Sequence, residues 1–117
     1  VLEKYTGEWP FDMPDKLLHL LQDRSYPAQF NDPNLHDVPV NFLHTTDITG
    51  GNSGSPVMDG QGRFIGIAFD GNWESIVADW VFIPDITRSI SVDARYILFI
   101  LREYANNDYV LNELEIE

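Results

Sequence analysis

One serine, Ser53, lies between Asn52 and Gly54 in a glycine-rich stretch, TGGNSGSP, that spans residues 49–56. Acyl transfer by a hydroxyl group needs a nucleophilic oxygen, a base that takes its proton, and backbone N–H groups that stabilise the oxyanion. This stretch can supply the first and the third. Gly51 permits a bend that turns its own N–H and that of Ser53 into one pocket, while Gly54 leaves room for a substrate. The stretch therefore predicts a nucleophile with an oxyanion hole.

Other glycine-rich motifs fit the spacing less well. A phosphate-binding loop carries a lysine before its Ser or Thr and leads into a helix, whereas SPVM predicts a strand here. A nucleophile elbow needs glycine two residues after the serine, where this chain has Ser55. The local pattern leaves one alternative open, which is a tight turn that happens to carry a polar residue.

The base that such a serine needs is harder to find among the three histidines. His19 falls on the polar side of a predicted helix, and His44 alternates with apolar residues in a predicted strand, as structural histidines do. His36 is followed by Asp37, but adjacent residues rarely orient each other as base and acid, and NDPNLHDVP is typical of a loop. We therefore assign no base within this chain.

The composition limits the partners and cofactors. The chain has 117 residues, the length of one domain, with 19 Asp and Glu against 7 Lys and Arg and a net charge of −12. Nucleic acid and anionic membranes are therefore poor partners, whereas a cationic group would be attracted; acidic surfaces more often serve only solubility. The absence of cysteine excludes disulfides and zinc–thiolate sites, and we expect no metal or cofactor.

The periodicity predicts a mainly β chain with flanking helices. We expect a helix over FDMPDKLLHLLQDR, capped by Asp12 and with leucines on one face, and then an extended loop. Strands are predicted over VNFLHTT, SPVMD, RFIGIAF and TRSISV, with a hairpin at GQG. A helix capped by Asp93 follows, and a short one begins at Asp108 in a tail, NNDYVLNELEIE, that is otherwise expected to be disordered. The segments are 1–37, 38–92 and 93–117.

Over a longer span the sequence resembles a known family. GNSGSP resembles the active-site serine loop of chymotrypsin-like peptidases. TTDITGGNSGSPVMDGQGRFIGIAFDGNWE, with RSISVDARYILFIL behind it, resembles the bacterial dipeptidyl peptidase 7 and 11 family, exopeptidases that remove dipeptides from free N-termini. The similarity runs from about residue 38 to 104, and FDMPDKL is similar more weakly. The resemblance implies the nucleophile-bearing half of a chymotrypsin-like (trypsin-like) double β-barrel with a C-terminal helix.

The resemblance also implies roles for individual residues. Ser53 is the nucleophile, and Gly51 forms the oxyanion hole with it. The FDGN segment borders the substrate: Asp70 holds its N-terminal ammonium, Gly71 lines the pocket for the residue before the cut bond, and Asn72 belongs to the same border. Family members that prefer Asp or Glu carry arginine at the position of Gly71, whereas glycine implies a hydrophobic preference. Without the resemblance, FDGN would be interpreted as a turn at the end of a strand.

Asp47 lies six residues before Ser53, where trypsin-like enzymes carry the acid that selects Lys or Arg. We do not predict basic specificity from this spacing, because the resemblance includes this acid in members that do not cut after basic residues. The expected role of Asp47 is structural, through hydrogen bonds in the loop.

In this family the catalytic His and Asp lie well before the serine. We therefore expect a C-terminal segment of a longer enzyme of the periplasm or cell surface, inactive alone and dependent on an N-terminal remainder. Peptides with free N-termini are the expected substrates, and a second copy of the enzyme, in a homodimer, is a further expected partner. Two alternatives stay open: a non-catalytic peptide-binding module on a half-barrel, and a structural fragment that self-associates through exposed strand edges.

Overall fold

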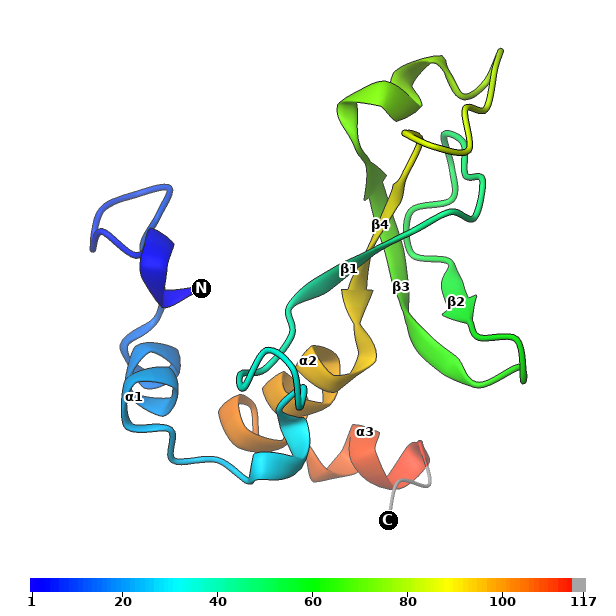
Figure 1. Ribbon diagram of the computed structural model, residues 1–117. Coiled ribbons are helices and arrows are strands. Elements are labelled where there is room, and N and C mark those ends of the chain that lie inside the picture. The colour runs from blue at the N-terminus through cyan, green and yellow to red at the C-terminus, as the bar shows by residue number, and fades with distance from the viewer. Residues whose placement is uncertain (115–117) are drawn as a thin grey trace. The chain divides into compact units, whose positions relative to one another are not determined.

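The computed structural model describes residues 1–114, and their contacts divide the chain into two compact units (Figure 1). We call Pro39–Tyr96 the sheet unit, and Val1–Val38 together with the chain from Ile97 onward the helical unit. The boundaries of the two units, at residues 38/39 and 96/97, differ from the expected segment boundaries at 37/38 and 92/93. No helix within the described residues is both long enough and apolar enough to cross a membrane.

The sheet unit contains a four-stranded antiparallel sheet with the order β1-β4-β3-β2. All four predicted strands are confirmed, each close to its expected place: β1 (Asn41–His44), β2 (Pro56–Met58), β3 (Phe64–Gly71) and β4 (Ser89–Asp93). The alternation that predicted β4 appears as alternating burial along the strand. The chain is thus mainly sheet with a few helices, as expected.

The predicted hairpin joins β2 to β3. Asp59 Oδ1 accepts hydrogen bonds from the backbone N–H groups of Gln61 and Arg63, at 2.9 and 3.0 Å, and Asp59 Oδ2 pairs with Arg63 Nε at 2.7 Å. The N–H of Arg63 lowers the pKa of the Asp59 carboxyl below its ordinary value. Gly62 has a φ of +78°, a conformation that glycine adopts without steric cost.

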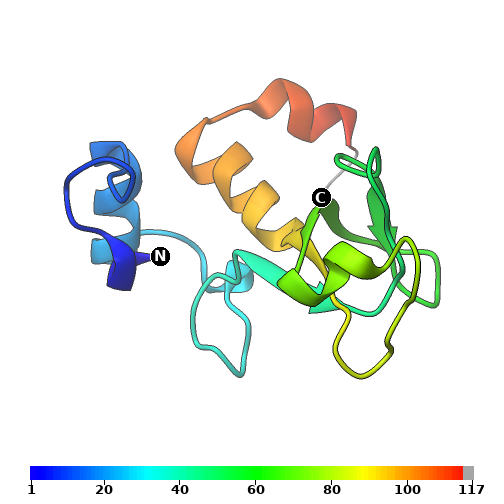
Figure 2. The same cartoon turned by 90° about the horizontal axis from the view of Figure 1, so that it is seen from above.

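Strand β3 carries a bulge at its far end, where the register with β4 shifts between Ala68 and Asp70. A bulge places an extra residue on one strand and re-aims the side chains beyond it. Asp70 and Gly71 follow the bulge and pair with Ile90 and Ser89. The strand then leads into a 3₁₀ segment, η3 (Trp73–Val77), drawn yellow-green in Figures 1 and 2.

In the helical unit, α1 (Asp15–Asp23) is accompanied by the 3₁₀ turns η1 (Leu2–Lys4) and η2 (Ala28–Phe30). The helix α2 (Ala94–Phe99), whose first three residues belong to the sheet unit, begins directly after β4 and is continued by a π-helical turn, η4 (Ile100–Tyr104). Phe99 is fully buried, and its ring meets those of Tyr26 and Phe30 edge-on at centroid distances of 5.0 and 5.8 Å. Lys16 Nζ donates a hydrogen bond to the carbonyl of Tyr104.

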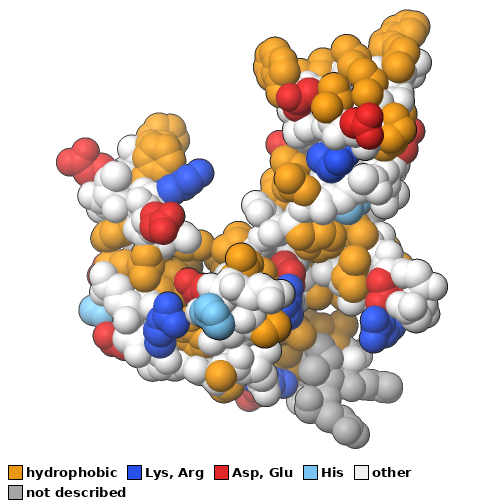
Figure 3. All heavy atoms as spheres, viewed as in Figure 1, with side chains coloured by type: hydrophobic (Ala, Val, Ile, Leu, Met, Phe, Trp, Pro, Cys, Tyr) orange, Lys and Arg blue, Asp and Glu red, His pale blue; other side chains and the backbone are white. Residues whose placement is uncertain are grey.

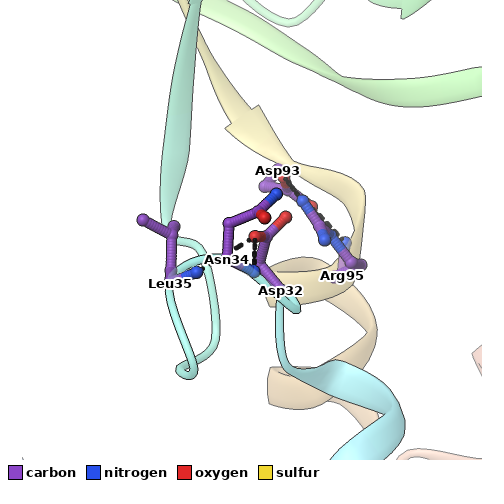
Figure 4. Close-up of polar contacts among 5 residues, drawn as sticks. All are labelled: Asp32, Asn34, Leu35, Asp93 and Arg95. Atoms are coloured by element: carbon purple, nitrogen blue, oxygen red, sulfur yellow. Dashed lines mark hydrogen bonds and ion pairs between the residues drawn. The ribbon is translucent and has the colours of Figure 1, made fainter.

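One predicted helix cap is confirmed and one is wrong. Asp93 Oδ1 accepts a hydrogen bond from the N–H of Arg95 at 2.9 Å and so caps α2, while its carboxylate pairs with the Arg95 guanidinium (Figure 4). Asp12 does not cap α1, which begins at Asp15 behind Pro14. Pro14 has a ψ of 138°, and this extended conformation keeps the residues before it out of the helix.

The expected disorder of the tail is wrong for residues 106–114. They contain α3 (Asp108–Glu113), which begins where the short helix was predicted. Asn107 caps it by accepting a hydrogen bond from Val110 N at 3.2 Å, and Leu111 is buried. The cap and one buried leucine give this helix the tertiary contact that a tail lacks. Residues 115–117 lie outside the described part.

The loop predicted between α1 and β1 is closed by its own hydrogen bonds. Asp32 Oδ1 accepts from the N–H groups of Asn34 and Leu35, at 2.9 and 3.2 Å (Figure 4). Asp32 and Asp37 form an isolated antiparallel bridge. This segment is thus a compact turn made by an aspartate that accepts backbone N–H groups.

Candidate active site

Ser53 lies in the loop between β1 and β2, and hydrogen bonds attach this loop to β3. The N–H of Gly54 donates to the carbonyl of Ala68 at 2.8 Å, and the N–H of Ala68 donates to the carbonyl of Ser55 at 2.9 Å. Within the loop, Asn52 Oδ1 accepts from the N–H of Thr49 at 2.8 Å. Sheet and loop together therefore fix the position of the serine.

Two glycines in the loop need the left-handed region that other residues rarely adopt. Gly51 has a φ of +97° and Gly54 a φ of +89°. Within residues 1–114, the N–H groups of Gly51 and Ser53 donate to no acceptor. The two N–H groups assigned to the oxyanion hole are thus left available for a ligand.

The Ser53 hydroxyl is exposed and has no base beside it in the described part of the chain. Its only hydrogen-bond partner there is the carbonyl oxygen of Phe69, at 3.5 Å, which is too long for an effective O–H···O hydrogen bond. No histidine or carboxylate of residues 1–114 accepts its proton. Within residues 1–114, the geometry therefore provides an exposed hydroxyl and free N–H donors without a proton acceptor.

The structure brings Ser53, Asp70 and Gly71 together in one pocket of about 240 Å³. The bulge in β3 and the anchored loop supply these three residues. Ser75, from the 3₁₀ segment η3, and Asp79 also line the pocket. Neither Ser75 nor Asp79 was predicted as a site residue, since nothing in WESIVADW forms a motif.

Asp70 keeps part of its carboxylate available. Its Oδ1 accepts a hydrogen bond from the N–H of Gly71 at 2.8 Å, and its Oδ2 has no partner within residues 1–114. The side chain is exposed. A carboxylate held by its own backbone, with one oxygen free, is suited to accept a hydrogen bond from a cationic group.

Asn72 is engaged within the fold at both ends of its amide. Its Oδ1 accepts from the N–H of Arg88 at 2.9 Å, and its Nδ2 donates to the carbonyl of Ile86 at 2.7 Å. The assignment of Asn72 to the substrate stays a prediction. This geometry favours an indirect contribution, in which Asn72 ties the end of β3 to the segment before β4.

Asp79 supports the serine loop from outside it. Its Oδ1 accepts a hydrogen bond from the hydroxyl of Thr49 at 2.6 Å. Together with Asp70 it gives the pocket two carboxylates, and no Lys or Arg lines this pocket. The local field therefore favours a positively charged ligand, in agreement with the net charge of the chain.

His44 is held in the sheet. Its Nε2 lies 2.7 Å from the hydroxyl of Ser91, a fully buried residue, and its Nδ1 is buried without a partner in the described residues. Burial lowers the pKa of His44 below its ordinary value. Its hydrogen bond within the sheet agrees with the structural role that its strand pattern predicted.

The other two histidines belong to the helical unit. His19 is exposed on α1, as expected. His36 is not oriented by Asp37, whose Oδ1 accepts instead from the N–H of Val38 at 2.8 Å and the Tyr26 hydroxyl at 3.3 Å. Neither histidine therefore forms a pair of base and acid with a carboxylate of the described chain.

The hydrogen bonding expected of Asp47 is not found: its carboxylate is exposed and accepts none within residues 1–114. Asn52 makes the side-chain hydrogen bond in this loop instead. The same part of the chain contains no group of three or more His, Cys, Asp or Glu side chains that could hold a metal ion.

Comparison with known proteins identifies the family. Residues 1–116 match Peptidase S46. The chain belongs to the peptidase S46 family. This S46 chain is 43% identical over 117 residues to dipeptidyl-peptidase 7 of Porphyromonas gingivalis, and 40% identical over 116 residues to an Asp/Glu-specific dipeptidyl-peptidase of Flavobacterium psychrophilum. The alignments cover 99% and 98% of the chain but 16% of each relative, so the chain spans less than a fifth of their length.

A solved structure supports the same relationship. The S46 chain resembles the crystal structure of Porphyromonas endodontalis DPP11 in complex with the dipeptide Arg-Asp, with a TM-score of 0.91 and 37% sequence identity. The match covers 99% of this chain and 16% of that one. Members of this family are hydrolases, and these relatives are dipeptidyl peptidases.

Proposed function

We propose that this S46 chain is the C-terminal catalytic segment of a serine dipeptidyl peptidase, and that its sheet is part of the nucleophile-bearing half of a chymotrypsin-like double barrel. The complete enzyme removes dipeptides from free peptide N-termini in the periplasm or at the cell surface, as a monomer or a homodimer. One observation carries the proposal: Ser53, Asp70 and Gly71 line the same pocket. In the described chain, moreover, the N–H groups of Gly51 and Ser53 have no acceptor.

The proposed reaction is acyl transfer. The Ser53 oxygen attacks the carbonyl carbon of the second peptide bond, and its proton passes to a histidine of the N-terminal remainder. The N–H groups of Gly51 and Ser53 donate to the oxyanion. The same histidine returns the proton to the leaving amine, and water then hydrolyses the ester to release the dipeptide.

Removal of dipeptides requires that the enzyme measure the distance from the substrate's N-terminus. Asp70 provides a reference point, since it lines the pocket that contains Ser53 and its Oδ2 has no partner within residues 1–114. A charge-assisted hydrogen bond to the ammonium fixes the register of the peptide. An endopeptidase would have no use for this charge.

We also propose a preference for hydrophobic residues before the cut bond. The pocket is lined by Gly71 and by the apolar side chains of Ile48, Phe69 and Ile76. In the family that the sequence resembles, glycine at this position goes with hydrophobic preference. Overall similarity does not decide the matter, because dipeptidyl-peptidase 7 and an Asp/Glu-specific dipeptidyl-peptidase are 43% and 40% identical to the chain.

The isolated chain is expected to be inactive. Without a base, the Ser53 hydroxyl keeps its high pKa and is a poor nucleophile. Exposed apolar side chains gathered over η3 and the loop after it are consistent with a segment that packs against the missing part (Figure 3). They include Trp73, Ile76 and Trp80, and Trp80 is 88% exposed.

The proposal is tested with the complete enzyme, in which this segment is joined to its N-terminal remainder. It should release dipeptides from peptides with a free N-terminus and a leucine as the second residue. Acetylation of the N-terminus should abolish the release, because it removes the ammonium that Asp70 binds. Equal cleavage of the acetylated peptide, or full activity of Ser53→Ala, would disprove the proposal.

A non-catalytic peptide-binding module is the second candidate, and it is favoured because no base lies beside Ser53 within residues 1–114. It predicts that peptides with free N-termini bind to the chain with an affinity that Asp70→Asn weakens and Ser53→Ala leaves unchanged. It also predicts no dipeptide release by the complete enzyme. Release that depends on Ser53 would rule this candidate out.

A further inference from the structure

We propose that Ser75 is the residue that restricts position 71 to glycine, and that it thereby sets the preference of the Ser53 pocket. This inference rests on the proposed function of that pocket. Ser75 acts through position 71 and is a positioning residue. Position 71 can accept a larger side chain only when residue 75 changes with it.

The space beside Gly71 is filled by Ser75. A Cβ atom added to Gly71 would lie 2.0 Å from Ser75 Oγ and 3.0 Å from Ser75 Cβ, with the carbonyl oxygen of Arg88 at 3.5 Å. Non-bonded carbon and oxygen atoms do not approach to 2.0 Å. Even alanine therefore requires Ser75 to move.

Ser75 cannot move without losing hydrogen bonds. Its hydroxyl donates to the carbonyl oxygen of Asn72 at 2.6 Å, and its N–H donates to the same oxygen at 2.9 Å. Asn72 is itself held at both ends of its amide, and its N–H donates to the carbonyl of Arg88 at 2.9 Å. Rotation of the hydroxyl would break one bond and still leave Ser75 Cβ too close.

The backbone of Gly71 does not itself demand glycine. Its φ lies outside the left-handed region, unlike those of Gly51 and Gly54 in the serine loop. Those two glycines have open space around the missing Cβ and are required by their conformation. Gly71 is the reverse case, in which a neighbouring side chain imposes the requirement, and removal of that side chain should lift it.

This contact has a consequence for specificity. An arginine at position 71 would give the pocket a cation, which would attract an acidic residue before the cut bond. With Ser75 in place, the arginine would distort the turn from Asn72 to Ser75 rather than enter the pocket. A change from hydrophobic to acidic preference therefore needs Gly71→Arg and a reduction of Ser75 together.

A double-mutant cycle in the complete enzyme tests the inference. Gly71→Ala should lower Tm by about 1–2 °C, since overpacking at a held side chain is destabilising. Ser75→Gly should recover most of that loss in the double variant, although it lowers Tm by itself. Gly60→Ala is the matched control: this glycine has no atoms within 4 Å of an added Cβ, and Tm should not change.

The readout of specificity is the ratio of kcat/KM for peptides with Asp and with Leu as the second residue. Gly71→Arg alone should lose activity on both, whereas Gly71→Arg with Ser75→Gly should raise the ratio by about tenfold or more. A full shift in Gly71→Arg alone, or no recovery of Tm by Ser75→Gly in the Gly71→Ala background, overturns the inference. A wild-type enzyme that cleaves neither peptide contradicts the proposed function and the specificity role, and the Tm cycle still decides the packing claim.

Discussion

Ser53 differs from an ordinary surface serine in its surroundings. Its loop is fixed to β3 by two backbone hydrogen bonds, its neighbour Gly51 has a φ of +97°, and a carboxylate with a free oxygen lies in its pocket. A tight turn with a polar residue would account for the positive φ of Gly51, but not for the carboxylate in the pocket. The catalytic interpretation therefore gains support from geometry that the local pattern alone left open.

Asp70→Asn tests the recognition of the substrate's N-terminus. In the complete enzyme it should lower kcat/KM by about 10 to 100-fold, because a hydrogen bond between charged groups contributes about 1.5–3 kcal/mol. Asp85→Asn is the matched control, an exposed aspartate outside the pocket. Steady-state kinetics with one peptide substrate that has a free N-terminus measures kcat/KM for both variants. The role given to Asp70 fails if the two variants behave alike.

His44 should make the stability of the chain depend on pH. Its folded-state pKa is lowered below 6.5 by burial, so the unfolded chain binds the proton more readily. Neutral His44 makes its full contribution to the free energy of unfolding at pH values above the unfolded pKa. This contribution is lost as pH falls from the unfolded pKa through the lower folded pKa. Tm should therefore fall more between about pH 7.5 and pH 5.5 in the wild type than in His44→Gln.

The control for this measurement is His19→Gln, which changes an exposed histidine on α1. It should keep the wild-type pH dependence. An unchanged pH dependence in His44→Gln would show that the buried ring does not contribute in this range.

At the residue scale, the sequence and its family resemblance predicted the candidate residues that lie in continuous motifs. Ser53 and Gly51 come from one stretch, and Asp70 and Gly71 from another. Ser75 and Asp79 were missed because their contacts cross a turn and a loop, and their stretch of sequence has no signature. Ser75 lies against the position where a Cβ of Gly71 would be only when η3 is folded beside β3.

At the element scale, β3 determines the position of the site. It pairs with β4 on one side and β2 on the other, and Ala68 forms the backbone hydrogen bonds that attach the serine loop to it. Its bulge lies directly before Asp70. Close approach of its neighbours is possible because of Gly66, where an added Cβ would lie 2.3 Å from the carbonyl oxygen of Val92. The ring of Phe42 lies at 2.7 Å from the same point.

Gly66→Ala should therefore be strongly destabilising. The clashing atom is a backbone oxygen of the adjacent strand β4, which cannot rotate away, so the expected loss is about 2–3 kcal/mol. Gly60→Ala in the hairpin turn, with open space around it, should change the free energy of unfolding by less than about 0.5 kcal/mol. Urea denaturation measures both, and equal stabilities would show that β3 and β4 can separate without cost.

The elements were predicted well where periodicity carries the signal. The alternation in TRSISV and RFIGIAF correctly predicted β4 and β3. The change to helical spacing at Asp93 correctly predicted α2 and its cap. The start of α1 was predicted wrongly because a single residue determines it. Pro14 is extended, so α1 begins at Asp15 and Asp12 does not cap it. The bulge in β3 has no signal in the sequence, because it depends on pairing with β4.

At the scale of the whole molecule, the proposed function makes this chain one part of an active site. It spans 16% of the length of dipeptidyl-peptidase 7 from Porphyromonas gingivalis, and its described residues place no base beside Ser53. Its net charge of −12 and the two carboxylates of the pocket suit a substrate with a cationic N-terminus. These features agree with a segment that is completed by the remainder of a longer enzyme.

Labelling with a fluorophosphonate probe tests the central claim most directly, because the probe reacts with an activated serine. The isolated chain should remain unlabelled, and the complete enzyme should be labelled at Ser53, with no labelling of its Ser53→Ala variant. Equal labelling of the isolated chain would show that the base lies within it. Labelling of the complete enzyme that persists in Ser53→Ala would show that Ser53 is not the nucleophile.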